Sequence, residues 1–377
     1  MKYYIIAGEA SGDLYGSNLV RELKLKDSKA DIRAWGGNLM QEEGVDLVKH
    51  YKNHNYMGFL EVIRNLGTIL KNISFCKQDI KAFNPDALIL IDFPGFNMRI
   101  AKYFYKYSFP VLYYIAPQVW AWKESRVEAI KKYVDKLYVI LPFEKEFLKK
   151  HGVESSYMGH PLLEHILNFK NKESVSKSIF TETYGLEFGK PIISLIPGSR
   201  KQEIEKKLPV MLRAVSSYSN EYNIVIAGMK NFKDLYREIT SNSNVKIIYG
   251  DTYNLLNNSI RALVTSGTAT LESAFFNVPQ IVCYKTSWLS YVIAKSLVKI
   301  KYISLVNLIM DKEVVKELIQ NNLNYINLTK ELNILNDALA LNKMKEAYKV
   351  LIAKCKGENV SENIAIDMFK TIESFQK

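Results

Sequence analysis

The sequence has little cysteine, and the few cysteines it has are poorly placed for a shared bond or a metal ion. Its three cysteines, Cys76, Cys283 and Cys355, lie far apart, and no Cys-x-x-Cys pair occurs. We therefore expect neither a disulfide framework nor a structural zinc site. The pattern favours a reducing compartment, which is the cytoplasm.

Long apolar segments are also missing. After Lys2, only five apolar residues precede Gly8, which is too short for the apolar part of a signal peptide. The longest run without a charged residue, Tyr107–Trp122, contains Pro110 and Pro117. It falls short of the ~20 apolar residues that a membrane-spanning helix needs. Any contact with a membrane is therefore expected at its surface.

Common metal and phosphate motifs are absent as well. No two aspartates stand at positions i and i+2, and there is no Gly-x-x-x-x-Gly-Lys-Ser/Thr loop. His50 and His54, like His160 and His165, form close pairs in the sequence but lack a convincing third ligand nearby. We expect no metal site.

What the chain does have is length and positive charge. Its 377 residues correspond to about two domains, at roughly 150 residues per domain. It carries 51 Lys and Arg against 39 Asp and Glu, a net charge of +12. This excess indicates an anionic partner, which could be a nucleic acid, an acidic lipid surface or a phosphorylated substrate.

Short apolar runs alternate with longer amphipathic segments, the pattern of βαβ units around a parallel sheet. The first set of expected strands is Tyr3–Ala7, Ala87–Ile91, Val111–Ile115 and Lys136–Leu141. The second set is Ile192–Ile196, Ile224–Ala227, Val245–Ile248, Ala262–Thr265 and Gln280–Tyr284.

A polar stretch, Asn168–Thr183, separates the two sets and is the expected domain boundary. The predicted fold class is α/β, with two Rossmann-like, doubly wound domains facing a cleft. We assign residues 1–167 to the first domain, 184–345 to the second and 346–377 to a C-terminal helical segment that packs back. In such sheets, ligands bind beyond the carboxyl ends of the strands.

Two strand ends in the first domain could carry chemistry. After the first strand, Gly8 and Gly12 permit a tight turn, and Ser11 or Asp13 could cap the following helix. The alternative is a capped turn with no ligand. Asp92 follows the buried strand Ala87–Ile91, where burial would raise its pKa and suit it to proton abstraction. The alternative for Asp92 is a structural hydrogen-bond acceptor.

The second domain has two turns of a phosphate-binding type. Gly198, Ser199 and Arg200 follow one strand, and an arginine can hold a phosphate with two hydrogen bonds. Ser266–Glu272 follows another strand, with Thr268 and Glu272 one helical turn apart. Together the turns suggest a nucleotide diphosphate, with Glu272 accepting ribose hydroxyls. Capped helices without a ligand are the alternative.

Aromatic and aliphatic side chains suggest two further contacts. Trp120 and Trp122 lie in a loop after a strand, where they could stack on a sugar, line an acyl-chain pocket or belong to the core. Basic amphipathic stretches suit an anionic lipid surface, although each could instead face its own domain core. The first stretch includes Phe59, Val62, Ile63, Leu66 and Ile69, and the second includes Trp288, Leu289, Val292, Ile293 and Leu297.

Taken together, these segments resemble the lipid-A-disaccharide synthase family. The matching pieces occur in the family's order over nearly the whole chain. They are Gly8–Asp13, Met57–Val62, Ile91–Asn97, Pro117–Trp122, Leu141–Glu144, Gly159–Pro161, Pro197–Arg200, Ser266–Glu272 and Ser304–Leu308.

The resemblance implies a family-19, metal-independent hexosyltransferase with the GT-B fold. Its reaction joins UDP-2,3-diacylglucosamine to 2,3-diacylglucosamine 1-phosphate with inversion, giving a β-1,6-linked disaccharide 1-phosphate and UDP. It also implies a peripheral position on the inner face of the cytoplasmic membrane, a homodimer that exchanges carboxyl-terminal segments, and no nucleic-acid partner.

The resemblance also assigns roles to particular residues. Asp92 matches the general base. The UDP-sugar contacts would be Ser199, Arg200, Gly267, Thr268, Glu272 and Asn307, and the acceptor loop would be Glu9, Ser11, Gly12, Asp13 and Trp120. Two other classes stay open: another GT-B enzyme, such as a UDP-N-acetylglucosamine 2-epimerase, and a non-catalytic nucleic-acid-binding protein.

Overall fold

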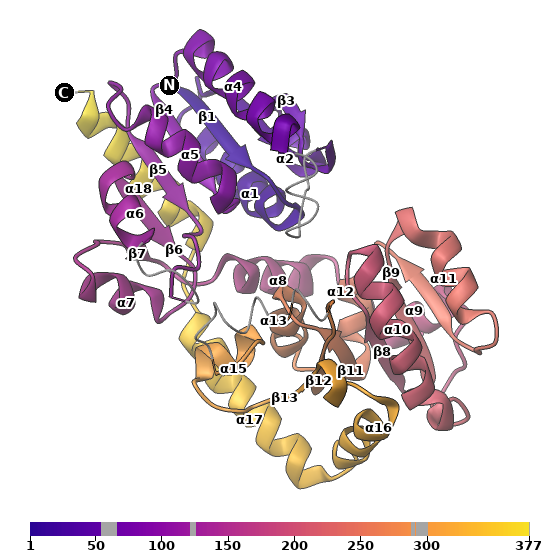
Figure 1. The fold of residues 1–377 in the computed structure, drawn as a ribbon. Coiled ribbons are helices and arrows are strands. Elements are labelled where there is room, and N and C mark those ends of the chain that lie inside the picture. Colours follow the sequence, from indigo (N-terminus) through magenta and orange to yellow (C-terminus); the bar gives the residue numbers. More distant parts are fainter. Residues whose placement is uncertain (54–65, 121–125, 288–290, 292–300, 377) are drawn as a thin grey trace. The chain divides into compact units, whose positions relative to one another are not determined.

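The computed structural model describes residues 1–53, 66–120, 126–287, 291 and 301–376, which form two compact units (Figure 1). The first unit contains the described residues of 1–164 and 356–377. The second contains those of 165–295 and 300–355. Each unit is built on a parallel sheet with helices, so the chain is an α/β protein with two Rossmann-like domains.

The first sheet has the order β3-β2-β1-β4-β5-β6-β7. Its strands are β1 (Lys2–Ala7), β2 (Asp31–Gly36), β3 (Asp46–His50), β4 (Ala87–Ile91), β5 (Val111–Tyr114), β6 (Lys136–Val139) and β7 (Ser156–Tyr157). The helices of this part of the chain are α1 (Ala10–Lys26), α2 (Asn38–Glu42), α4 (Leu66–Phe83), α5 (Pro94–Phe104), α6 (Arg126–Tyr133), α7 (Glu144–Lys150), α8 (Pro161–Lys172) and α18 (Val360–Phe375).

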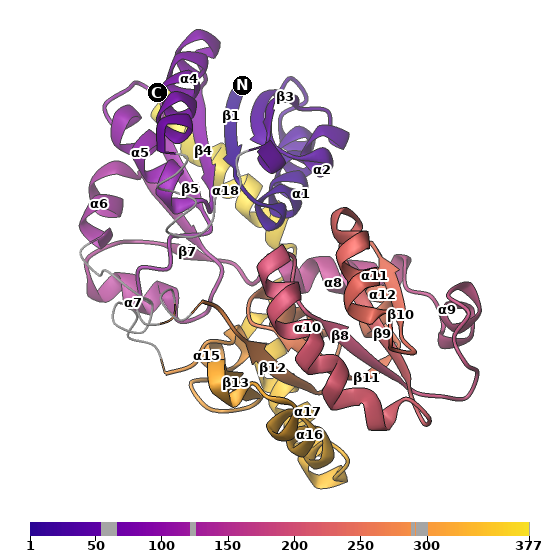
Figure 2. The same cartoon turned by 45° about the vertical axis from the view of Figure 1, so that its right-hand side comes forward.

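The second sheet has the order β10-β9-β8-β11-β12-β13. Its strands are β8 (Ile192–Ile196), β9 (Asn223–Gly228), β10 (Lys246–Tyr249), β11 (Ser259–Thr265), β12 (Gln280–Tyr284) and β13 (Lys316–Ile319). Its helices are α9 (Lys177–Thr183), α10 (Lys201–Val215), α11 (Lys233–Thr240), α12 (Thr252–Asn257), α13 (Thr268–Phe275), α15 (Leu305–Met310), α16 (Tyr325–Ile334) and α17 (Ala338–Cys355). Within this unit, α10 packs beside α11 and α16 (Figure 2).

The central strands are apolar because helices shield both faces of each sheet from water. Every residue of β4 and of β8 is buried, and both strands are runs of aliphatic side chains apart from Ser194. Strands buried on both faces show such continuous runs instead of alternation. The two central strands therefore anchor the two cores and fix where the loops that follow them begin.

The last helix, α18, belongs to the first unit, where it packs against α1. The Glu164 carboxylate accepts hydrogen bonds from the Ser361 backbone N–H at 3.1 Å and from its hydroxyl at 2.5 Å. The Tyr138 hydroxyl donates to Asp367 at 2.8 Å. A Cβ on Gly357 would lie 1.9 Å from a backbone carbonyl oxygen, so only glycine fits where the chain enters this helix.

The stretch that we expected to separate the domains is folded. Most of Asn168–Thr183 lies in the end of α8 and in α9, and the division between the units comes earlier, after Glu164. The Ser176 hydroxyl caps α9 by accepting from the Ile179 N–H, and Phe180 is fully buried. The buried Phe180 side chain and the Ser176 cap therefore hold α9 in place in this polar segment. Of the described helices, none has the length and apolar character to cross a bilayer.

Candidate functional site

The first candidate site lies at the switch point of the first sheet. β1 and β4 are neighbours, and the strand order runs away from them in opposite directions. Open α/β sheets bind ligands at this position, beyond the carboxyl ends of the two strands. The turn after β1 and the residues after β4 meet there, because a Cβ on Gly8 would lie 2.3 Å from the Phe93 ring.

Asp92 is the first residue after β4, and its backbone is held in an uncommon conformation. Asp92 has φ +47° and Phe93 has φ +51°, both in the left-handed region. The Asp92 carbonyl accepts hydrogen bonds from the Tyr113 hydroxyl at 2.7 Å and from the Asn97 side-chain amide at 2.8 Å. Non-glycine residues persist in this region only when surrounding contacts hold them, and such residues cluster at functional sites.

The Asp92 side chain has the acidity of a base that works near neutral pH. Burial raises the pKa of its carboxyl to about 6, and a hydrogen bond from the Phe93 N–H offsets part of this rise. A general base acts best when its pKa lies near the working pH. The raised pKa expected from the sequence is present.

A second carboxyl group at this edge of the sheet, Glu144, was not singled out as a site residue in the sequence. It begins α7 and is 2% exposed. Its carboxylate accepts from the Trp120 indole N–H at 2.9 Å and from the Leu141 N–H at 2.9 Å. Burial, with a small contribution from the charge of Asp92, raises its pKa to about 7, although the hydrogen bonds that the carboxylate accepts oppose this rise. Only the tertiary fold shows that these two carboxyl groups interact.

The side chains in the turn after β1 do not cap α1 as we expected. α1 begins at Ala10 with Glu9 as its N-cap and no side-chain capping bond, so the predicted cap at Ser11 or Asp13 is wrong. Asp13 is buried and instead caps α2, because its carboxylate accepts from the Gly37 N–H at 2.7 Å and the Met40 N–H at 3.1 Å. Its carboxylate therefore holds two loops together.

Gly12 has a packing role in the same turn. It is buried, and a Cβ there would lie 3.2 Å from the Ala7 Cβ. The helix α1 thus approaches β1 closely at its first turn. Ser11 and Glu9 are half-buried in this turn.

The second candidate site lies at the equivalent position of the second sheet, between β8 and β11. After β8, Gly198 has φ +122°, and the Ser199 N–H donates to the Glu203 carboxylate at 3.2 Å. Ser199 and Arg200 are exposed, and Arg200 is the N-cap of α10. Arginine and helix N–H groups are suited to bind an anion there.

After β11, the turn leaves open space in front of α13. Gly267 has φ +131°, and a Cβ added to it would meet no atom within 4 Å. Thr268 is exposed, and Glu272 is half-buried one turn later. Burial raises the pKa of Glu272 to about 7, although a hydrogen bond from Tyr253 lowers it somewhat. Because β8 and β11 are adjacent and parallel, the two predicted turns lie at one edge of one sheet.

Asn307 occupies a more internal position than its expected role would require. It is fully buried, and its side-chain amide donates to the Val315 carbonyl at 2.8 Å and to Glu317 at 2.9 Å. Its oxygen accepts from the Val314 and Val315 N–H groups at 2.8 and 3.0 Å. These four bonds use both amide hydrogens and both lone pairs. Here Asn307 ties α15 to β13.

Comparison with known proteins identifies the family. A family model described as lipid-A-disaccharide synthetase matches residues 3–369. A lipid-A-disaccharide synthase 1 of Legionella pneumophila strain Philadelphia 1 is 36% identical, covering 93% of this chain and 94% of its own. The lipid-A-disaccharide synthase of Geobacter sulfurreducens is 32% identical, covering 96% and 94%.

The chain belongs to the lipid-A-disaccharide synthetase family. It is therefore a glycosyltransferase, specifically a hexosyltransferase, of lipid A biosynthesis. The resemblance stated from the sequence is confirmed. Of the two open classes, a non-catalytic nucleic-acid-binding protein is excluded by this membership.

Solved structures agree on the GT-B fold of this family member. A UDP-GlcNAc 2-epimerase from Neisseria meningitidis, bound to UDP-GlcNAc, has a TM-score of 0.66 at 13% identity, covering 99% of this chain and 100% of its own. A glycosyltransferase from Rickettsia africae has a TM-score of 0.58 at 15% identity, covering 98% of each chain. At these identities the likeness concerns the fold alone.

The stripe proposed for membrane contact in this family member is only partly described. Phe59, Val62 and Ile63, like the second stretch around Trp288, lie outside the described residues. Leu66 begins α4 and is 46% exposed, whereas Ile69 packs against the core of the first unit. The described part of the stripe therefore contributes to both the core and the surface.

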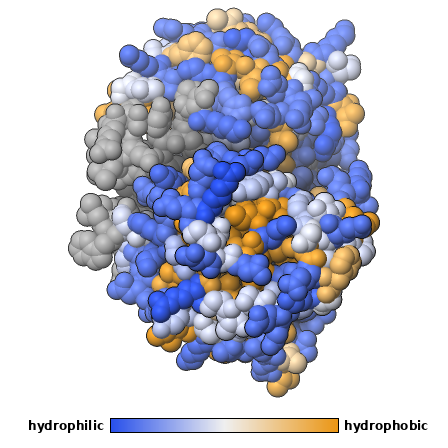
Figure 3. Space-filling view, turned by 90° about the vertical axis from the view of Figure 1, so that its right-hand side faces the viewer, coloured by the Kyte–Doolittle hydropathy of each residue, from blue (hydrophilic) through white to orange (hydrophobic). Residues whose placement is uncertain are grey.

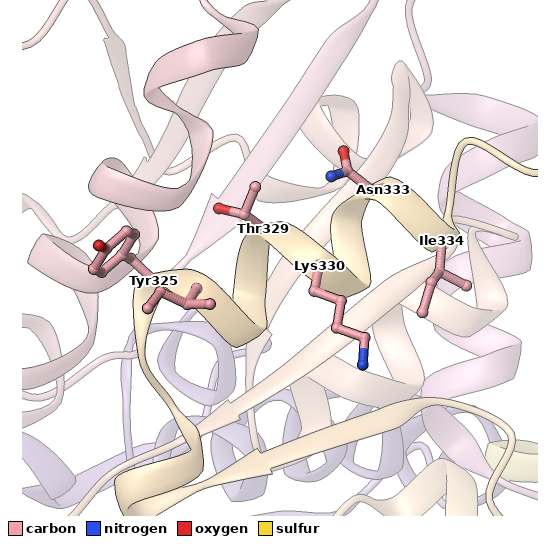
Figure 4. Close-up of a pocket in the computed structure, with 6 residues that line it drawn as sticks. Tyr325, Thr329, Lys330, Asn333 and Ile334 are labelled. Atoms are coloured by element: carbon pink, nitrogen blue, oxygen red, sulfur yellow. The ribbon is translucent and has the colours of Figure 1, made fainter.

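Apolar patches occur elsewhere on the surface, and on the face drawn in Figure 3 they lie among largely hydrophilic residues. One cavity is lined by one face of α16, including Tyr325, Thr329 and Asn333 (Figure 4). Thr329 bonds to the Ala214 carbonyl near the end of α10, whereas Arg200 precedes that helix. At 1.5 Å per residue, the two ends lie about 20 Å apart. This cavity is separate from the candidate donor site.

Proposed function

We propose that the protein joins UDP-2,3-diacylglucosamine to 2,3-diacylglucosamine 1-phosphate, giving a β-1,6-linked disaccharide 1-phosphate and UDP. The observation that carries this proposal is Asp92, with its raised pKa, fixed at the switch point of the first sheet. The 6-hydroxyl of the acceptor is a poor nucleophile. Asp92 takes its proton as the oxygen attacks the anomeric carbon opposite UDP, so the configuration inverts.

The donor binds to the second unit in this proposal. Negative charge grows on the departing diphosphate, and the Arg200 guanidinium and the positive ends of the helices that begin near Ser199 and Thr268 stabilise it. The ionised Glu272 carboxylate accepts the ribose hydroxyls. Asn307 acts indirectly, since its hydrogen bonds hold the chain between α15 and β13 in place.

The acceptor lies along the turn after β1 in this proposal. Glu9 and Ser11 are the members of this turn that contact it, whereas Asp13 and Gly12 shape the turn from behind. Trp120, held by Glu144, contributes one aromatic face. No metal ion takes part, because the cationic and N–H groups of the second unit supply the positive charge that the diphosphate needs.

Incubation of the purified protein with both diacylated substrates, with EDTA and without added metal, tests this function. We expect UDP and the lipid disaccharide as products in mass spectrometry. Water-soluble UDP-GlcNAc in place of the diacylated donor gives no product and no epimer. Epimerisation of UDP-GlcNAc, or a strict requirement for a divalent cation, would contradict the proposal.

We further propose that the enzyme collects its substrates at the anionic inner face of the cytoplasmic membrane, as a homodimer. Exposed leucines of α4, Leu66 and Leu70, and the net charge of +12 support lipid contact. Flotation with phosphatidylglycerol vesicles should fall as salt is added. Replacing both leucines by Gln should weaken it, whereas Leu25→Gln, at an exposed leucine of α1, should not. Light scattering gives the oligomeric state.

A further inference from the structure

A buried lysine lies beneath the candidate donor site. Lys207, on α10, is 2% exposed. Its ammonium group donates a short hydrogen bond to the Thr265 hydroxyl and lies 3.9 Å from a Glu203 carboxylate oxygen. Nothing in the sequence marked it out, because it stands among several lysines and glutamates at the start of a helix.

Keeping a charge in this position has a cost. Lysines are rarely buried completely, since an ammonium group loses its hydration in the interior. Burial accordingly lowers the pKa of Lys207, and the nearby Glu203 opposes that shift. An apolar side chain of similar size would avoid this cost. The contribution of the charge is therefore expected to come from the groups that the ammonium contacts.

Lys207 connects the two turns of the donor site. Thr265 is the last residue of β11 and directly precedes the turn at Gly267. Glu203 uses its other carboxylate oxygen to accept the Ser199 N–H from the turn after β8. A continuous path therefore runs from Ser199 through Glu203 and Lys207 to Thr265.

The charges around this path leave a positive surplus. Lys207 and Arg200 contribute two positive charges and Glu203 one negative charge, which gives a net charge of +1. The buried Cys283 thiol in β12 interacts electrostatically with the ammonium group, but burial raises the pKa of that thiol to about 12. It is therefore neutral at pH 7 and does not cancel the lysine.

We propose that Lys207 is a positioning residue for the diphosphate of the donor: it fixes the spacing of the turns after β8 and β11 and adds a buried positive charge beneath them. This inference rests on the proposed binding of a uridine diphosphate sugar to the second unit. It concerns the diphosphate and not the nucleoside, so it predicts that Lys207 affects UDP binding but not uridine binding.

The test measures the affinities of UDP and uridine by calorimetry for the full-length protein. In Lys207→Met, we expect UDP to bind at least tenfold more weakly and the uridine affinity to change less than threefold. Lys206→Met removes the same charge from the neighbouring residue of α10, and it should leave both affinities within threefold of the wild type. Thermal unfolding of each variant checks that it is folded.

The outcomes separate the possible failures. If the wild type binds neither UDP nor uridine, the proposed donor site itself is wrong. The proposal is also wrong if the wild type binds UDP and Lys207→Met binds it equally well. If the affinities of Lys207→Met for UDP and for uridine fall to the same degree, Lys207 has only a structural role. Should Lys207→Met fail to fold, Lys207→Gln, which keeps a polar end near Thr265, is measured against the same criteria.

Discussion

The two units share the order of six strands but have opposite chemistry at the carboxyl ends of those strands. In both sheets the strand order reverses at a central pair, β1 and β4 in the first and β8 and β11 in the second. The first edge presents the carboxyl groups of Asp92 and Glu144, both with raised pKa values. The second edge presents Arg200 and the buried Lys207, with Glu272 as its carboxyl group.

This difference shows how one fold supports two tasks. The topology determines only where loops converge, and the few side chains after each strand determine what they do there. A buried carboxyl group without a cation beside it has a raised pKa, so its carboxylate can act as a base near neutral pH. Cations beside free N–H groups favour an anion. Substitutions at either edge should therefore impair different steps, proton transfer at the first and UDP binding at the second.

The largest effect is expected for Asp92→Asn. Asparagine keeps the size and the backbone contacts of the residue but cannot take a proton. We expect kcat to fall by about 10²- to 10⁴-fold, the range for loss of a general base, while UDP affinity stays within threefold. In the wild type, activity should fall as the pH drops below about 6, because the base becomes protonated. Near-normal turnover in the variant would remove Asp92 from this role.

Arg200→Ala should weaken UDP binding at the edge of the second sheet. The variant loses an exposed guanidinium at the start of α10, and we expect UDP affinity and kcat/KM to fall by about 10²-fold. Calorimetry with UDP and steady-state kinetics measure the two effects. Arg237→Ala, on α11 of the same unit and also exposed, is the matched control and should change neither. Equal losses in both variants would indicate a general charge effect.

The pH dependence of UDP binding should report on Glu272. If the ionised carboxylate binds the ribose, affinity should rise by up to about tenfold from pH 6 to 8, because the pKa of Glu272 is raised to about 7. Glu272→Gln, which cannot titrate, should lose this rise in affinity between pH 6 and pH 8. An identical pH profile in the two proteins would show that the carboxylate does not contribute.

Folding stability gives an independent check on Glu272. The folded-state pKa exceeds the ordinary value of 4.5, so the contribution of Glu272 to stability is present below pH 4.5 and is lost as the pH rises through 7. Glu272→Gln should therefore be more stable than the wild type at pH 8, by up to about 3 kcal/mol at about 1.4 kcal/mol per pH unit. Thermal or urea unfolding at pH 5 and pH 8 measures this.

Much of this architecture was predictable because hydrophobic patterning marks buried parallel strands. The expected bounds of β4, β8 and β12 are those observed. β2 and β13 were missed since they interrupt apolar residues with charged ones. In β2, Arg33 is paired with Asp46 on β3 and, at 2.7 Å, with Asp79, which lies far along the chain.

The site was predictable to the extent that topology alone positions it. Asp92, Arg200 and Glu272 could be placed at strand ends or first helical turns from sequence. The partners of Asp13, Asn307 and Glu144 could not, because those side chains bond to segments that the tertiary fold brings to them. The sequence alone therefore does not distinguish a polar residue near a strand end that binds a ligand from one that binds the protein's own backbone.

The smallest expected effects are changes in folding stability when one glycine at each edge, Gly267 or Gly95, is replaced by alanine. Gly267 has φ +131° and ψ −160°, a region nearly restricted to glycine, so Gly267→Ala should lower stability by about 1–3 kcal/mol. Gly95 lies in α5 near Asp92 and, like Gly267, has no atom within 4 Å of an added Cβ. Gly95→Ala should therefore change stability by less than about 1 kcal/mol, in the stabilising direction. Urea unfolding measures both, and equal changes in stability would show that the backbone conformation of Gly267 does not set the cost of its replacement.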